Sequence, residues 1–385
     1  MKCVETPLRE IFTFSNGINF NKSAYSPGVK LIGVSNFGNR FSPDYEELHE
    51  INRKFVRIGD YLRNGDIIFV RSNGNKELVG RCMLIKDILQ PVTFSGFCIR
   101  ARIKNTREHD PTFFTYYFKS AAFRKAISGN AVGANIQNLS QERLSNYIAC
   151  VPDIVSQRKI ANILSTYDIL IENNQKQIKL LEEAAQRLYK EWFVDLRFPG
   201  HENTKITDSI PEGWRRGALA DVATFKRGKT ITKEQTNPGV VPVVAGGLEP
   251  AYFHDTFNTG APVITVSGSG ANAGVTRMYH TKVWASDCSY VDSVATENLA
   301  WVYCFLKENN TKIETMQKGA AQPHVYAKDI NALEAVIPND KQMKRFQAIA
   351  EPMFARIGTL ETQKARLREA RNCLLPKLMN GEIEV

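Results

Sequence analysis

The 385-residue sequence lacks the motifs that mark most metal-binding and disulfide-stabilised proteins. Its seven scattered cysteines include no C-x-x-C pair, and its six histidines form no H-E-x-x-H pattern, so no zinc site is indicated. An odd and dispersed set of cysteines indicates no disulfide framework either. We therefore expect reduced thiols in the core of a cytoplasmic protein, and no bound metal.

Catalytic and cofactor motifs are missing as well. The run SGSGANAG from Ser267 has neither the G-K-S/T ending of a phosphate loop nor a clear helix after it. The nearest approach to the N/D-P-P-aromatic run of a methyltransferase is Asn237-Pro238-Gly239, which lacks the second proline and the aromatic residue. The residues therefore show no recognisable catalytic centre, and they give only weak support to nucleotide binding.

Long apolar runs are also absent, and the opening MKCVETPLREIF has no basic region followed by an apolar one. We accordingly expect neither export nor membrane insertion. Lys and Arg outnumber Asp and Glu by 50 to 40, and the net charge of +10 favours a polyanionic partner such as DNA or RNA. The length suggests two domains or more.

What the sequence does contain is an uninterrupted helical pattern from Ser156 to Leu196. Residues that are mostly apolar recur at alternating steps of four and three, the heptad pattern of a helix that packs against another helix. About forty residues at 1.5 Å each would form a rod of roughly 60 Å. The seam residues are Ile160, Leu164, Tyr167, Ile171, Asn174, Ile178, Leu181, Ala185, Leu188 and Trp192.

A second copy of this helix follows 186 residues later. Its seam positions are Phe346, Ala350, Met353, Ile357, Leu360, Lys364, Leu367, Arg371, Leu374 and Leu378. The match begins before the helix, with GANIQNLSQERLSNYIACVPD from Gly133 aligned on GAAQPHVYAKDINALEAVIPN from Gly319. The starts of the two copies match at a spacing of 211 instead, TFSNG at Thr13 with TFKRG at Thr224. The chain therefore repeats one plan, a globular segment of variable length before a helix of fixed register.

Each globular segment reads as short strands followed by a helix, which predicts two similar α+β domains. The second long helix is the expected packing partner of the first, and the internal repeat is expected to form a pseudo-two-fold body. Pro352 is expected to kink or break the second helix near Glu351. Charges at Lys364 and Arg371 either fix the register or face another subunit. The predicted boundaries are 1–152 for the first domain, 153–198 for the first helix, 199–213 for an exposed linker, 214–338 for the second domain and 339–385 for the second helix.

Two loops that follow equivalent strands mix Gly, Asn and Ser with a basic residue: RSNGNKELVGR from Arg71 and SGSGANAGVTR from Ser267. Such loops can bring guanidinium and amide groups to base edges. TFKRGKTITK from Thr224 carries cations suited to phosphate contacts. One such run is usually a solvated loop, whereas recurrence in two copies favours DNA contact. The candidate DNA-binding residues are Lys22, Arg71, Asn73, Asn75, Lys76, Arg81, Lys226, Arg227, Lys229, Lys233, Ser267, Ser269, Asn272 and Arg277.

Several stretches resemble the specificity subunit of type I restriction-modification systems. They are SIPEGWRRGALADVATFKRGKTIT, VPDIVSQRKIANIL, LEEAAQRLYKEWF and the closing LLPKLMNGEIEV. The resemblance covers the whole chain in the order variable domain, helix, variable domain, helix. It implies a non-catalytic reader of double-stranded DNA, in which each target recognition domain reads one half of a bipartite, asymmetric site. The resemblance also implies that the two helices pack as an antiparallel coiled coil and set the spacing between the halves.

The resemblance also implies partners. Two methyltransferase subunits would dock on the repeated helical regions, and two restriction subunits can join them, so S-adenosylmethionine, ATP and Mg would belong to those partners. Adenine methylation and restriction would be their reactions, directed by this chain. Two other readings stay open from the residues: a methyltransferase or nuclease with an unfamiliar site, and a coiled-coil adaptor for proteins without salt-dependent affinity for DNA.

Overall fold

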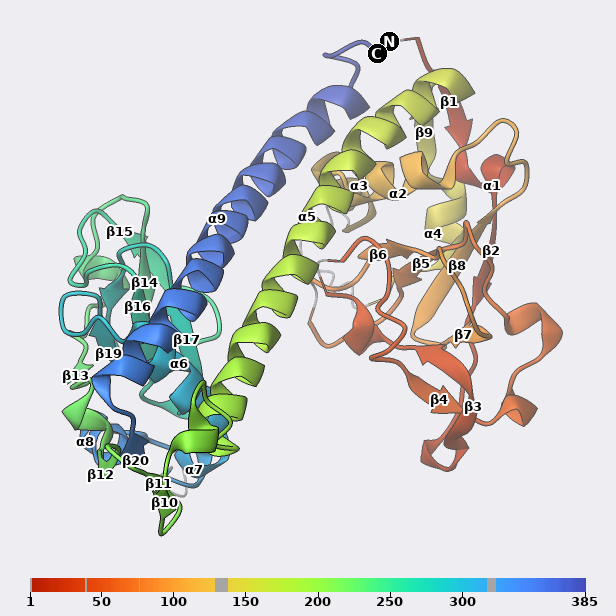
Figure 1. Ribbon diagram of the computed structural model, residues 1–385. Coiled ribbons are helices and arrows are strands. Elements are labelled where there is room, and N and C mark those ends of the chain that lie inside the picture. Colours follow the sequence, from red (N-terminus) through yellow and green to blue (C-terminus); the bar gives the residue numbers. More distant parts are fainter. Residues whose placement is uncertain (1, 39, 76, 129–137, 317–322) are drawn as a thin grey trace. The chain divides into compact units, whose positions relative to one another are not determined.

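The computed structural model describes residues 2–38, 40–75, 77–128, 138–316 and 323–385 (Figure 1). The chain divides into two compact units: unit 1 comprises Met1–Glu172 and Ala365–Val385, and unit 2 comprises Asn173–Lys364. Each unit holds one α+β domain and a part of both long helices. The matched stretches that start at Gly133 and Gly319 begin in residues outside the described ranges.

The described residues of the domain of unit 1 form nine strands in three sheets. β1 (Val4–Pro7) pairs antiparallel with β9 (Ile148–Val151), so the beginning and the end of the domain meet. The four-stranded sheet has the order β2 (Phe12–Asn16), β8 (Cys98–Ile103), β5 (Ile67–Val70), β6 (Cys82–Leu84). The three-stranded sheet has the order β4 (His49–Ile51), β3 (Tyr25–Ile32), β7 (Val92–Phe94), with β7 parallel to β3. The helices are α1 (Leu8–Ile11), α2 (Pro111–Lys119), α3 (Ala121–Ser128) and α4 (Gln141–Asn146).

The domain of unit 2 repeats this arrangement strand for strand. β12 (Arg215–Ala218) pairs antiparallel with β20 (Glu334–Ile337). The four-stranded sheet has the order β13 (Lys226–Arg227), β19 (Cys288–Asp292), β16 (Val263–Ser267), β17 (Thr276–Tyr279). The three-stranded sheet has the order β15 (Tyr252–His254), β14 (Val241–Val244), β18 (Trp284–Ala285), with β18 parallel to β14. The helices are α6 (Leu299–Glu308), α7 (Asn310–Thr315) and α8 (Ala327–Asn331).

Two glycines that lie 211 residues apart in the sequence occupy equivalent positions in the two domains. A Cβ on Gly17 would lie 2.3 Å from the carbonyl oxygens of Phe94 and Ser95, and a Cβ on Gly228 would lie 2.3 Å from that of Ser286. Both positions therefore need glycine because a neighbouring backbone passes too close for any side chain. The prediction of two similar α+β domains in an internal repeat is confirmed.

The two long helices are α5 (Ile154–Tyr189), extended by a π-helical turn over Lys190–Val194, and α9 (Asp340–Met379). Their N-termini are capped at equivalent positions. The Asp153 carboxylate accepts hydrogen bonds from the backbone N–H groups of Val155 and Ser156, and the Asn339 side chain accepts one from Gln342 at 3.0 Å. Such caps satisfy the first N–H groups of a helix, which have no partner within it.

The helices contact each other within each unit, and they run antiparallel there. In unit 1, Ile160 and Leu164 of α5 share a core with Leu378 near the C-terminus of α9. In unit 2, the C-terminal part of α5 packs on the N-terminal part of α9, where Tyr189 and Trp192 lie 6.1 Å from Phe346 between ring centroids. The seam residues are buried or half-buried throughout, as the heptad pattern predicts.

The two seam charges have partners on the facing helix. Within unit 1 the Arg371 guanidinium pairs with the Asp168 carboxylate, and within unit 2 the Lys364 ammonium donates to the Gln175 side chain at 2.6 Å. The pairs are seven residues apart on each helix and in opposite directions, which is the spacing of an antiparallel heptad seam. These contacts favour the register-fixing interpretation of both charges.

A kink or a break was expected at Pro352, and the structure shows that the second helix is not broken there. α9 continues from Asp340 to Met379 through Pro352. A proline inside a helix leaves the carbonyl four residues earlier without its N–H partner. That carbonyl belongs to Ala348, and both residues lie on the exposed face, where water can satisfy it.

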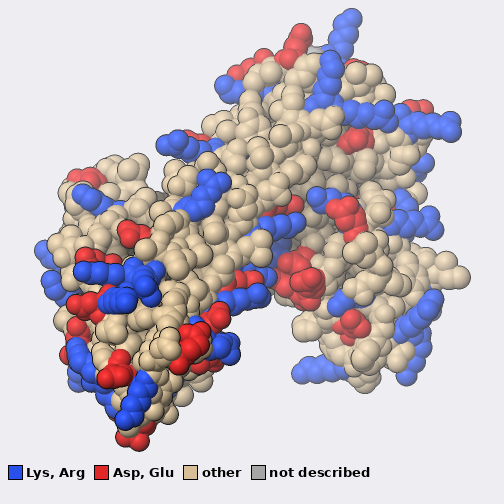
Figure 2. All heavy atoms as spheres, in the orientation of Figure 1, with Lys and Arg blue, Asp and Glu red and all other residues tan. Residues whose placement is uncertain are grey.

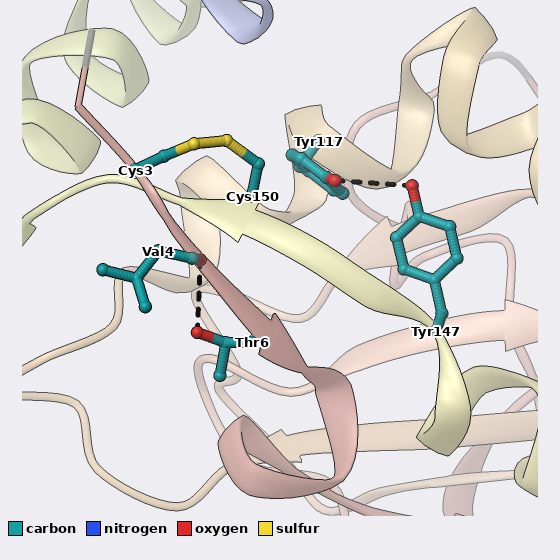
Figure 3. Close-up of a disulfide and its surroundings, with 6 residues drawn as sticks. All are labelled: Cys3, Val4, Thr6, Tyr117, Tyr147 and Cys150. Atoms are coloured by element: carbon teal, nitrogen blue, oxygen red, sulfur yellow. Dashed lines mark hydrogen bonds between the residues drawn. A yellow bond between two sulfur atoms is a disulfide. The ribbon is translucent and has the colours of Figure 1, made fainter.

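The expectation of reduced core cysteines is partly wrong. Cys3 and Cys150 form a disulfide, with their Cα atoms 5.4 Å apart (Figure 3). The pairing of β1 with β9 brings them together although 147 residues separate them in sequence, and no local spacing signals such a contact. Cys82, Cys98, Cys288 and Cys304 are buried free thiols, whereas Cys373 is exposed. Burial raises the pKa of Cys82 to about 11, which is typical of an unreactive thiol.

The segment expected to be an exposed linker is partly folded. A short hairpin joins β10 (Ile206–Thr207) to β11 (Ile210–Pro211), and its two turn residues both have positive φ. Phe198 before it and Trp214 after it stack in the core of unit 2, with ring centroids 4.8 Å apart. In unit 1, α2 and α3 are separate helices, divided at Ser120. No helix within the described ranges is long and apolar enough to cross a membrane.

Candidate nucleic-acid interface

The two expected reading loops occupy equivalent places, each after a central strand. In unit 1 the Leu139 N–H donates to the Arg71 carbonyl at 2.8 Å, and in unit 2 the Val325 N–H donates to the Gly268 carbonyl at 3.1 Å. Leu139 and Val325 are 186 residues apart, the spacing of the helical repeat. Each loop is therefore held between its β strand and the segment that leads to its long helix.

In unit 1 the loop is built from successive turns held by its own side chains. The Asn73 side chain accepts from the Asn75 N–H at 2.7 Å, and the Asn75 side chain accepts from the Glu77 N–H at 3.0 Å. Arg71 donates to the Gly96 carbonyl at 3.3 Å, and Arg81 donates to the Glu77 carbonyl at 3.2 Å. Lys22 is exposed in a separate short helix (Lys22–Ala24), and Lys76 lies outside the described residues.

In unit 2 the expected base-reading residues support the loop from inside. The Ser267 hydroxyl, which is buried, and the Asn272 amide both donate to the Gly246 carbonyl, at 3.2 and 3.3 Å. The Ser269 hydroxyl is bonded to the Asp287 carboxylate. The Ser267 side chain thus holds the loop together. Arg277 is half-buried on β17, where its charge lowers the pKa of Tyr279 against the dominant rise caused by burial.

The basic run of unit 2 is exposed. Lys226 and Arg227 form the edge strand β13, Lys233 lies in a short helix (Lys233–Gln235), and the Lys229 ammonium lies 6.0 Å from the Trp284 ring centroid. Lys226 also lines a cavity of about 730 Å³. There the Lys282 ammonium lies 4.0 Å from the Phe257 ring centroid, a pair that the sequence analysis missed because it has no motif.

Figure 2 shows Lys and Arg spread over the visible face and interspersed with Asp and Glu, so the net positive charge is not gathered into a single stripe there.

The two domains place different side chains at equivalent positions. The Cys98 and Cys288 carbonyls are equivalent, since they accept from the Gly17 and Gly228 N–H groups at 3.2 and 2.8 Å. Two residues further along the same strands stand Arg100 in unit 1 and Tyr290 in unit 2, followed by Arg102 and Asp292. Arg102 makes a bidentate pair with Asp66, with both N···O distances 2.7 Å. The frame is repeated, whereas its polar side chains are not.

This arrangement defines a class of protein: two tandem α+β domains of one design, each joined to an antiparallel helix pair, with loops and cations suited to nucleic acid. Within the described ranges no group of His, Cys, Asp and Glu is placed to hold a metal ion. The chain belongs to the family of type I restriction modification DNA specificity domains, whose model matches residues 3–183 and 211–369.

Individual relatives are similar over most of the chain. The type I restriction enzyme MjaIX specificity subunit of Methanocaldococcus jannaschii is 26% identical over 71% of this chain and 69% of its own length. The putative specificity subunit S.MpnORF638P of Mycoplasma pneumoniae is 28% identical over 69% of this chain and 72% of its own. The crystal structure of a type I restriction-modification S subunit from M. genitalium shares the fold, with a TM-score of 0.64 at 17% identity, covering 98% of this chain and 96% of that one.

Proposed function

We propose that this chain is the non-catalytic DNA-specificity subunit of a type I restriction-modification complex. Each domain reads one half of a bipartite, asymmetric site in double-stranded DNA. The observation that carries the proposal is the repeat itself: one strand framework occurs twice, with different polar side chains in the equivalent loops after β5 and β16, Asn73 and Asn75 in the first and Ser269 and Asn272 in the second. Two copies of one frame with different readers suit a target whose two halves differ in sequence.

The long helices suit the second part of this function, which is to hold two readers apart and to carry partner subunits. Two methyltransferase subunits would dock on the repeated helical regions, and two restriction subunits would join them. S-adenosylmethionine, ATP and Mg would then serve chemistry on the partners, and this chain would direct where adenine is methylated and where DNA is restricted. Family membership supports these partners.

The decisive experiment exchanges the first domain, residues 1–152, for the same segment of another family member and maps methylated adenines in cells. One half of the recognised site should change while the other half and the gap stay the same. If both halves changed, or neither did, the assignment of one domain to one half would be wrong. The reciprocal exchange of residues 214–338 is the matched control, because it should change the other half only.

The spacing role has its own test. A heptad inserted into both α5 and α9 preserves the antiparallel seam and lengthens the pair by about 10 Å, which corresponds to roughly three base pairs at 3.4 Å each. The unread gap should grow by about that number. An unchanged gap in a folded, methylating complex would show that the helices do not set the spacing. A conservative seam change, Ile178→Leu, should leave the gap as it is.

Two measurements separate this function from its alternatives. The purified chain alone should transfer no methyl group and cleave no DNA, because those reactions would belong to the partners. The assembled complex should bind duplex DNA with an affinity that falls steeply with salt. Methyl transfer by the chain alone would indicate an enzyme, and salt-independent or absent DNA binding would indicate an adaptor.

A further inference from the structure

Unit 1 contains a cavity of about 490 Å³ that the reading loops do not explain. It lies among the end of the loop after β5, the helices α2 and α3, and the C-terminal part of α9. Four cationic side chains line it, and two carboxylates accompany them. The cations are Arg81, Lys119, Arg124 and Arg371, and the carboxylates are Glu77 and Asp168.

One of the two carboxylates, that of Asp168, already accepts hydrogen bonds from two neighbouring side chains. Asp168 accepts from both the Tyr116 hydroxyl and the Arg371 guanidinium. The other three cations donate to neutral backbone carbonyls: Lys119 to Arg40 at 2.9 Å, Arg124 to Glu77 at 2.9 Å, and Arg81 to Glu77 at 3.2 Å. Among the residues that the structure describes, none of these three forms an ion pair. The cavity wall therefore carries an excess of positive charge.

Burial makes this excess costly for the protein alone. Burial lowers the pKa of the Lys119 ammonium and of the Arg124 guanidinium. One nitrogen of Arg124, Nη1, is buried without a hydrogen-bond partner in the described part of the chain. Buried cations and donors of this kind are normally compensated by an anion or a hydrogen-bond acceptor.

We propose that this cavity binds a phosphate group, held by Arg81, Lys119 and Arg124. Guanidinium groups match phosphate oxygens in a planar fork, and an ammonium adds a point charge beside them. The volume lies in the range of small-molecule sites, so the phosphate can belong to a larger molecule. Two sources share this chemistry: a backbone phosphate of DNA bound to unit 1, which rests on the proposed function, and a free phosphorylated small molecule, which does not.

The test titrates the full-length chain with sodium pyrophosphate at constant ionic strength and follows binding by calorimetry, with sodium chloride as the blank. Arg81→Gln and Arg124→Gln remove cavity cations, and Arg107→Gln removes an exposed arginine of the same unit that is not among the lining residues. Binding weakened about tenfold or more in the two cavity variants, and retained in Arg107→Gln, would support the proposal for a free phosphate.

A second arm measures the affinity of the assembled complex for its duplex target at several salt concentrations. If the source is a DNA backbone phosphate, each cavity variant should reduce the slope of log affinity against log salt by about one, relative to Arg107→Gln. Wild-type chain that binds no pyrophosphate, together with unchanged DNA slopes in the variants, would overturn the proposal. Circular dichroism shows whether a variant has failed to fold. In that case the titration of the wild-type chain with pyrophosphate still tests the proposal. Absent DNA binding with intact pyrophosphate binding would refute the proposed function alone.

Discussion

The contact between Asp168 and Arg371 offers a sharp test of the helix pairing, because the internal repeat supplies its own control. In unit 1 the Asp168 side chain is 11% exposed and that of Arg371 is 21% exposed, and Tyr116 donates to the same carboxylate. Adding 186 to Asp168 leads to Phe354, and subtracting 186 from Arg371 leads to Ala185. In unit 2 Phe354 packs edge-on against Tyr303 of α6, with ring centroids 5.4 Å apart. One unit thus uses a polar triad where the other uses apolar packing.

Replacing Asp168 by Ala should destabilise unit 1 by about 3 kcal/mol, because removing one partner of a buried ion pair leaves the other charge uncompensated. We take the lower end of the range since both side chains keep some contact with solvent. The Tyr116 hydroxyl would also lose its acceptor. Burial raises the pKa of Tyr116 well above its usual value and Asp168 raises it further, so this hydroxyl stays protonated and needs an acceptor.

The double change Asp168→Phe with Arg371→Ala rebuilds in unit 1 the pair found in unit 2. It should be about 1–2 kcal/mol less stable than the unchanged protein, because well-packed apolar residues can replace a buried ion pair at little cost, but the Tyr116 hydroxyl still loses its acceptor. The two substitutions should therefore be strongly non-additive.

Urea unfolding provides the assay, with two probes that report on different units. All four tryptophans, Trp192, Trp214, Trp284 and Trp301, belong to unit 2, so fluorescence follows that unit, whereas circular dichroism follows both. Glu183→Ala is the control, since the contact between Glu183 and Lys179 is an exposed pair at 4.0 Å on the same helix and should contribute less than about 0.5 kcal/mol. Two results would refute this reasoning. One is a loss of unfolding free energy for Asp168→Ala that is no larger than that of the control, and the other is a double variant as unstable as Asp168→Ala.

Three further predictions concern single positions. Gly358→Ala should destabilise unit 2 by about 1–3 kcal/mol despite better helix propensity, because its Cβ would lie 2.6 Å from the His280 Cβ; a more stable protein by tryptophan fluorescence in urea would contradict that close approach. Burial lowers the pKa of His280, so the unfolded chain takes up the proton first and the native state loses stability as pH falls below about 6.5, by at most about 1.4 kcal/mol per pH unit. The stability difference between the wild type and His280→Gln should shift accordingly between pH 7.5 and 5.5, and a constant difference would rule this out. Cys3→Ser should lower the stability of unit 1 by about 2–4 kcal/mol under oxidising conditions, measured by circular dichroism, and a reducing agent should then affect the wild type but not the variant.

Some of the buried strands can be predicted from the sequence, and others cannot. β5 is a short, fully buried apolar run, and β16 is fully buried and rich in β-branched residues, so both can be recognised from composition. β8 reads CIRARI, and its two arginines argue against a buried strand. Only the folded domain shows that Arg102 finds Asp66 and that Arg100 donates to the Gly59 carbonyl, which makes burial of both tolerable.

The candidate site likewise has a part that the sequence predicts and a part that it does not. The loops after β5 and β16 were recognisable because they recur, yet Ser267 and Asn272 turned inward to the Gly246 carbonyl, a partner more than twenty residues away. The cations of the phosphate cavity come from a loop, two helices and the far end of the chain, and no spacing in the sequence relates them.

By itself the sequence determined that the chain carries two copies of one domain and two helices with a common seam. Periodicity and repetition are properties of neighbouring residues, so folding does not alter them. The tertiary structure alone decided which charges meet. Arg371 reaches Asp168 across 203 residues, and Cys3 reaches Cys150 across 147, because closing the chain on itself pairs strands and helices that are remote in sequence.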